Sequence, residues 1–232
     1  MHTIRTRLAG GALALAATAG LLAATAGQQA GASSPGTYPD GRLKGVAVVK
    51  DIRAALARRH VRVPGRPVRA VTFGDAEGRN LVVFSLRTDR RAPYTERTRL
   101  YVDQFATRHG LTRRLRAVRD QVLCGDGDLT GRFKTGSPAL TDNDHDGVAE
   151  VTFAYLRGCS GDVSPSTFKL LVLEGGTKYI VRGLSWEDQN GPLTGGGERL
   201  AFGTPEPAWS RWPAPLAKRA KEIYHQWTYL AP

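Results

Sequence analysis

The strongest constraint on the fold lies in residues 141–151, which read Thr-Asp-Asn-Asp-His-Asp-Gly-Val-Ala-Glu-Val. Aspartates occupy every second position, a glycine follows the third aspartate, and a glutamate lies four residues after it. Calcium takes six to eight oxygen ligands, and a loop of this spacing supplies them by turning alternate carboxylates inward. Three carboxylates packed so closely repel one another unless a cation lies between them. The stretch therefore predicts a cation-binding loop.

The order of ligands in such loops assigns a role to each residue of this stretch. We predict that Ca²⁺ is bound by the carboxylates at the first, third and fifth positions, the backbone carbonyl at the seventh and a carboxylate at the ninth, which are Asp142, Asp144, Asp146, Val148 and Glu150. Gly147 supplies the sharp backbone turn at the sixth position. The alternative is a polar turn, rich in Asp, Asn and Gly, that binds nothing tightly.

The residues after the loop indicate a strand, not the second helix of an EF-hand. Residues 151–156 are rich in β-branched and aromatic side chains, and the twelfth loop position, where an EF-hand has a bidentate glutamate, is Phe153. In this respect the loop resembles the D-x-D-x-D-G-x-x-[DE] loops that lead into strands in integrin-type propeller repeats.

The first 26 residues are typical of a signal peptide. Arg5 and Arg7 precede an uncharged run rich in Ala, Leu and Gly over residues 8–22, and cleavage sites follow at Ala26 or Ala32. The run is too short to predict a membrane span in the mature chain. We therefore expect a secreted, extracellular protein that could associate with the cell wall, with a disordered tail over 27–43 and one globular domain over 44–232.

The two cysteines are expected to pair, because exported proteins meet oxidising conditions. A bridge between Cys124 and Cys159 would enclose the acidic loop and, by chain entropy, contribute about 4 kcal/mol. A reactive thiol is the alternative, but the sequence places no histidine beside either cysteine to activate it.

The hydrophobic pattern predicts an α+β fold of mainly antiparallel hairpins. Period-two alternation and turn residues favour hairpins over 68–88, 100–123 and 168–182. Helical spacing predicts a short N-terminal helix over 46–59 and an amphipathic C-terminal helix over 216–230.

The net charge of +12 favours anionic partners such as cell-wall polymers, lipid head groups or nucleic acid. A basic stripe at Arg113, Arg114, Arg116 and Arg119 could hold a polyanion or simply form a solvated face. Because the leader predicts export, no nucleic-acid partner is expected, and an anionic cell-wall or surface polysaccharide fits better.

Several short blocks of the second half stand out: the acidic loop, Cys-Ser-Gly-Asp-Val-Ser-Pro at 159–165, Lys-Leu-Leu at 169–171, Glu-Gly at 174–175 and Lys-Tyr-Ile-Val-Arg-Gly at 178–183. With these blocks the chain resembles a family of exported bacterial proteins named for surface polysaccharide biosynthesis. The resemblance implies a link to envelope glycans and brings no catalytic residues with it.

Taken together, these features favour a non-enzymatic, calcium-binding envelope protein. The alternative is a metal-dependent hydrolase of envelope glycans or phosphodiesters, but the chain has no G-x-S-x-G, H-E-x-x-H or P-loop motif. Trp186, Trp209 and Trp212 could stack on sugars or belong to the core. The sequence indicates neither a specific ligand nor an oligomeric state.

Overall fold

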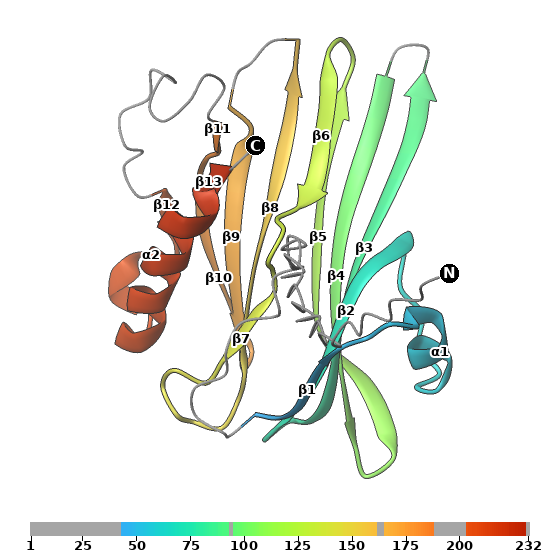
Figure 1. Ribbon diagram of the computed structural model, residues 1–232, viewed down its shortest axis with the longest axis vertical. Coiled ribbons are helices and arrows are strands. Elements are labelled where there is room, and N and C mark those ends of the chain that lie inside the picture. Colours follow the sequence, from blue (N-terminus) through green and yellow to red (C-terminus); the bar gives the residue numbers. More distant parts are fainter. Residues whose placement is uncertain (1–42, 93–94, 162–164, 188–202, 231–232) are drawn as a thin grey trace, which may run out of the picture. The chain divides into compact units, whose positions relative to one another are not determined.

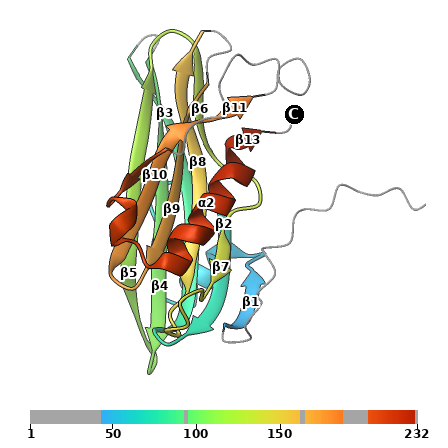
Figure 2. The same cartoon turned by 90° about the vertical axis from the view of Figure 1, so that its left-hand side faces the viewer.

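A computed structural model describes residues 43–92, 95–161, 165–187 and 203–230. In these residues two antiparallel β-sheets pack face to face, and a helix covers the outer face of each sheet (Figure 1, Figure 2).

The first sheet is a meander whose strands follow the order of the sequence. It contains β1 (Lys44–Val48), β2 (Arg66–Asp75), β3 (Gly78–Ala92), β4 (Thr95–Arg108) and β5 (Leu111–Cys124). Helix α1 (Ile52–Ala57) lies between β1 and β2 in the chain.

The second sheet has the order β12-β10-β9-β8-β6, and β7 also pairs with β8. Its strands are β6 (Asp128–Phe133), β7 (Ala139–Thr141), β8 (Glu150–Ser160), β9 (Thr167–Glu174), β10 (Thr177–Leu184) and β12 (Thr204–Glu206). The 3₁₀ turn η1 (Trp209–Arg211) and helix α2 (Ala214–Thr228) follow, and β11 (Trp186–Glu187) runs parallel to β13 (Tyr229–Leu230).

The main core lies between the two sheets. Phe84 of β3 and Phe153 of β8 meet there edge to face, with ring centroids 5.4 Å apart. Neighbouring residues on these strands point the other way, since side chains alternate along a strand. Leu81 and Val83 therefore pack beneath Leu56 of α1 in a smaller cluster on the outer face of the first sheet.

Strand β9 is buried on both faces. Leu171 and Leu173 contribute to the core between the sheets, whereas Leu170 and Val172 belong to the cluster beneath α2, which includes Ile223. This explains why the strand reads as a continuous apolar run instead of an alternating pattern.

The predicted α+β class is wrong, because the described residues are mostly antiparallel strand. The N-terminal helix predicted over 46–59 is also wrong: Lys44–Val48 forms β1, and helical structure covers only Ile52–Ala57. Val46 packs against the core between the sheets and Val49 against the cluster beneath α1, on opposite faces of the first sheet, so they do not form one helical face. Pairing of β1 with β2 satisfies the backbone instead. Asp51 starts the short helix by accepting the Ala54 N–H at 2.9 Å.

The hairpins and the C-terminal helix are found. The three expected hairpins correspond to β2–β3, β4–β5 and β9–β10, and α2 occupies the predicted C-terminal helix. The charged residues around Asp89 and Arg97 belong to the paired ends of β3 and β4. Cross-strand ion pairs support the pairing there: Arg97–Asp89 at 2.6 Å and Arg90–Glu96 at 3.2 Å.

The predicted signal peptide (1–26) and, apart from Leu43, the predicted tail (27–43) lie outside the described residues. Among the helices that the structure describes, none has the length and apolar character needed to cross a bilayer.

Candidate metal centre

The loop between β7 and β8 brings three aspartates together. One carboxylate oxygen from each of Asp142, Asp144 and Asp146 lies within 4.8 Å of the other two. Left-handed backbone at His145 (φ 64°) and Gly147 (φ 83°) coils the loop tightly. At Gly147 this conformation costs little, whereas at His145 it is strained.

Backbone amides of the loop hold some of the carboxylate oxygens. Asp142 Oδ1 accepts the Gly147 N–H at 3.3 Å, and Asp146 Oδ1 accepts the Val148 N–H at 2.7 Å. The other oxygen of Asp142, Oδ2, is buried with no hydrogen-bond partner among the described residues, and Asp142 itself is only 1% exposed. A buried, unpartnered carboxylate oxygen is costly, and a bound cation would compensate it.

A second acidic group shares Asp144 with the first. Oxygens of Asp144, Glu150 and Glu174 also lie within 4.8 Å of one another. Glu150 begins β8 and Glu174 ends β9, and these strands are neighbours, so both glutamates lie at the same end of the second sheet. Both are buried, at 1% and 7% exposure. Together the two groups form what we call the five-carboxylate cluster.

Hydrogen bonds orient Glu150 toward the loop. Its Oε1 accepts the Asn143 N–H at 2.7 Å, and its Oε2 accepts Asn143 Nδ2 at 3.3 Å. Asn143 Nδ2 also donates to Thr141 Oγ1 at 2.8 Å. The residue between the first two aspartates therefore positions a carboxylate instead of pointing into solvent.

The electrostatics of the cluster favour a bound cation. Burial raises the pKa of Glu150, and the charge of Asp144 raises it further, although hydrogen bonds from Thr141 and Asn143 oppose the shift. Burial, with a hydrogen bond and repulsion from Asp144 and charges on Glu150 and Asp146, raises the pKa of Glu174 to about 8. Without a cation, each negative charge in the cluster therefore makes ionisation of the neighbouring carboxyl groups less favourable.

The loop is also attached to the first sheet. The Ala76 N–H donates to the Gly147 carbonyl at 2.8 Å, and the Ala149 N–H donates to Asp75 Oδ2 at 3.1 Å. Asp75 is the last residue of β2, and Ala76 follows it in the turn that leads to β3. The five-carboxylate cluster therefore lies where the two sheets meet at one end of β8.

The predicted carboxylate ligands Asp142, Asp144, Asp146 and Glu150 are brought together, in a cluster that could hold a metal ion. Val148 lies in the same loop, and the role of its carbonyl oxygen stays a prediction. Sequence reasoning missed Glu174 as a cluster member. The available signal was a glutamate ending the apolar run 170–173, just before Gly175 and Gly176.

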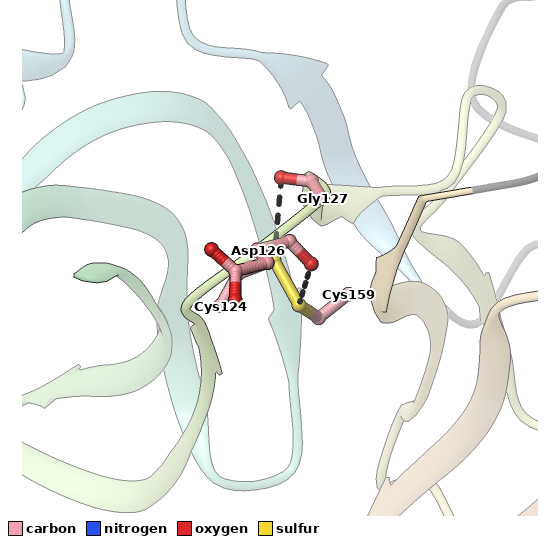
Figure 3. Close-up of a disulfide and its surroundings, with 4 residues drawn as sticks. All are labelled: Cys124, Asp126, Gly127 and Cys159. Carbon is pink, nitrogen blue, oxygen red and sulfur yellow. Dashed lines mark hydrogen bonds between the residues drawn. A yellow bond between two sulfur atoms is a disulfide. The ribbon is translucent and has the colours of Figure 1, made fainter. Parts of the chain in front are cut away.

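The predicted disulfide between Cys124 and Cys159 is present, with an S–S distance of 2.05 Å (Figure 3). It joins the end of β5 in the first sheet to β8 in the second. The carbonyl oxygens of Gly127 and Asp126 lie 3.4 and 3.8 Å from the two sulfurs (Figure 3). Because oxidised sulfur carries no proton, we regard these as close polar contacts and not as hydrogen bonds.

Two further expectations have structural outcomes. Trp212 is buried against Tyr179 and belongs to the core beneath α2, while Trp209 is partly buried beside it, with ring centroids 4.7 Å apart. Nothing is described of the Trp186 side chain. Comparisons of this chain with protein-family models, with curated proteins and with solved structures found no match.

Proposed function

We propose that this protein is an exported envelope protein that binds Ca²⁺ at the five-carboxylate cluster and, through it, fastens one sheet to the other. The observation that carries the proposal is Asp142 Oδ2, a buried oxygen without a hydrogen-bond partner among the described residues, within a cluster of carboxylates. The ligand atoms that the cluster offers are all carboxylate oxygens. Such oxygens suit a hard cation such as Ca²⁺ better than a softer transition metal, which favours nitrogen or sulfur ligands.

The proposed role is binding and not catalysis. Glu150 and Glu174 are buried, and Glu150 is held by Asn143, so these carboxylates are positioned to hold a cation. The proposed partner is an anionic cell-wall or surface polysaccharide. The basic composition, the predicted leader and the resemblance to exported proteins named for surface polysaccharide biosynthesis support this partner.

Calcium titration of the metal-stripped protein tests the proposal. We expect saturable heat and a higher melting temperature. At a hundredfold excess of calcium over Kd, linkage gives about 2.7 kcal/mol. For a chain of this size that amounts to a rise of about 5–10 °C.

Asp144→Asn is the decisive variant, because Asp144 belongs to both acidic groups. Removing its charge should raise the melting temperature of the calcium-free protein, by relieving repulsion, and abolish the further rise on adding calcium. Asp128→Asn changes an exposed aspartate outside the cluster and should leave both values unchanged. An unchanged calcium response in Asp144→Asn would overturn the assignment.

A further inference from the structure

A cavity of about 740 Å³ lies between the end of α1 and the adjoining ends of β3, β4 and β5. Its volume is within the range of small-molecule sites. The polar side chains around it are donors: Arg58, Arg59, Arg79, Thr72, Thr107 and Thr112. No carboxylate belongs to its lining in the described part of the chain.

The positive charge of the cavity is not compensated within the described residues. None of the ion pairs between those residues involves Arg58, Arg59 or Arg79. Arg59 Nε is buried without a hydrogen-bond partner among them, and Arg59 Nη1 reaches only the Ala55 carbonyl, at 3.4 Å. Burial, followed by repulsion from Arg79 and Arg58, lowers the pKa of Arg59.

The acidic residues nearest to Arg79 in sequence already have partners. Glu77 pairs with Arg116 at 3.0 Å, and Asp75 accepts hydrogen bonds from the Glu77 N–H at 2.9 Å and from Asn80 Nδ2 at 2.7 Å. Neither carboxylate is therefore available to neutralise the arginines of the cavity.

The basic stripe predicted on β5 is a weaker candidate for an anion. Arg114 and Arg119 both pair with Asp103, at 3.0 and 2.5 Å, and Arg116 pairs with Glu77. Three of its four arginines thus have a carboxylate partner within the fold, although Arg114 and Arg119 share one. The three arginines of the cavity beside α1 form no ion pair with a described residue.

The backbone that follows α1, which carries Arg58 and Arg59 of the cavity, forms a strained turn. His60, which also lines the cavity, has a left-handed backbone with φ 53°, and its N–H donates to the Ala57 carbonyl at 3.0 Å. Glycine is the usual residue at such a helix end. A histidine held there keeps an additional donor at the cavity wall.

We propose that this cavity binds the phosphate group of a phosphorylated sugar. Arginine forks match phosphate oxygens in bidentate geometry. The Thr72 hydroxyl already donates to the Asn80 carbonyl at 2.8 Å. Thr107 and Thr112 share one hydrogen bond at 2.9 Å, which leaves one hydroxyl hydrogen of this pair to complete the coordination. The cavity exceeds the size of a free phosphate ion, and Val49, Ala55 and Leu111 add apolar surface suited to the rest of an ester. The sugar part rests on the proposed function, since it names the anionic group that an envelope glycan would present.

Calorimetric titration with inorganic phosphate and with glucose 1-phosphate, at low ionic strength, tests the inference. The protein is first stripped of calcium, and the chelator is then exchanged away, because calcium precipitates phosphate and the chelator is itself an anion. We expect saturable binding of both probes, tighter for glucose 1-phosphate, and none of glucose. Arg59→Gln and Arg79→Gln should each weaken binding at least tenfold.

Matched controls make the result decisive. Arg79 is exposed on β3, so its substitution leaves the fold intact even if Arg59→Gln does not fold. Arg87→Gln removes another exposed arginine of β3, outside the cavity, and should bind like the unaltered protein. Asp144→Asn should retain phosphate binding, so failure of the calcium proposal is separable from failure of this one.

Three results would overturn the inference. These are no saturable binding at millimolar phosphate or glucose 1-phosphate, equal losses in Arg79→Gln and Arg87→Gln, and binding to phosphatidylglycerol vesicles without binding to glucose 1-phosphate. The last result would assign the arginines to a membrane surface.

Discussion

Asp120 concentrates the polar contact between the sheets in one residue. From β5 in the first sheet it accepts hydrogen bonds from Tyr155 Oη at 2.7 Å and from Lys169 Nζ at 2.6 Å, and it pairs with Arg157. Burial would raise the pKa of Asp120, but the hydrogen bonds from Lys169 and Tyr155 outweigh it, so that the pKa is below its ordinary value. Arg157 and Lys169 of the second sheet thus share one carboxylate, and removing it would leave both partly buried cations without this partner.

We predict that Asp120→Asn lowers the free energy of unfolding by about 3 kcal/mol at pH 7. Because the folded-state pKa is depressed, the carboxylate stabilises the fold fully above its unfolded pKa of about 3.9. That contribution is lost as the pH falls through the folded value. Urea unfolding across this range should show the two proteins converging in acid. An equally large gap on both sides of pH 3.9, or a similar loss in the exposed control Asp126→Asn, would contradict an ionic role.

Residues of this kind mark the limit of sequence reasoning. The aspartate spacing and glycine of the loop are local, and they sufficed to place four carboxylates of the cluster. Glu174 and Asp120 owe their roles to partners on other strands, and no local pattern gives the distance between strands. For the same reason the stripe on β5 looked uncompensated, although Asp103 and Glu77 pair with three of its arginines.

At the scale of elements, α2 packs on the outer face of the second sheet (Figure 2). Leu216, Ala220 and Ile223 meet Leu170 and its neighbours there. Apolar residues at helical spacing over 216–230 predicted this helix correctly. The pattern over 46–59 has a similar length, but its first part is rich in valine, which favours strands, and pairing with β2 decided its structure.

Helix α2 should contribute strongly to the stability of the whole domain. Ile223→Ala empties a position that is 2% exposed, so we predict a loss of about 2–4 kcal/mol in the free energy of unfolding. Gln226→Ala changes an exposed position of the same helix and should stay within about 0.5 kcal/mol. Urea denaturation measures both. A loss below about 1 kcal/mol for Ile223→Ala would mean that the helix is only loosely attached.

At the scale of the molecule, β8 has one fastening near each end. Glu150 of the five-carboxylate cluster begins the strand, and Cys159 lies nine residues further on, about 30 Å away at the usual rise of a strand. In the sequence the two cysteines flank the acidic loop, which suggested that the disulfide holds the loop directly. The distance along β8 shows that it does not.

This separation predicts that the two fastenings contribute independently. Replacing Cys124 and Cys159 by alanine should cost about 4 kcal/mol through the chain entropy of the unfolded state. The stabilisation by calcium should survive in this variant within about 0.5 kcal/mol, since distant sites add. Chemical denaturation with and without calcium measures both quantities. Loss of the calcium response on removing the disulfide would show that the bond shapes the cluster from a distance.

The sequential strand order of the first sheet has a consequence for the order of folding. Strands β1 to β5 can pair with one another without any strand of the second sheet. Until the second sheet has formed, the thiol of Cys124 has no partner, and Phe84, Leu100 and Val102 face water.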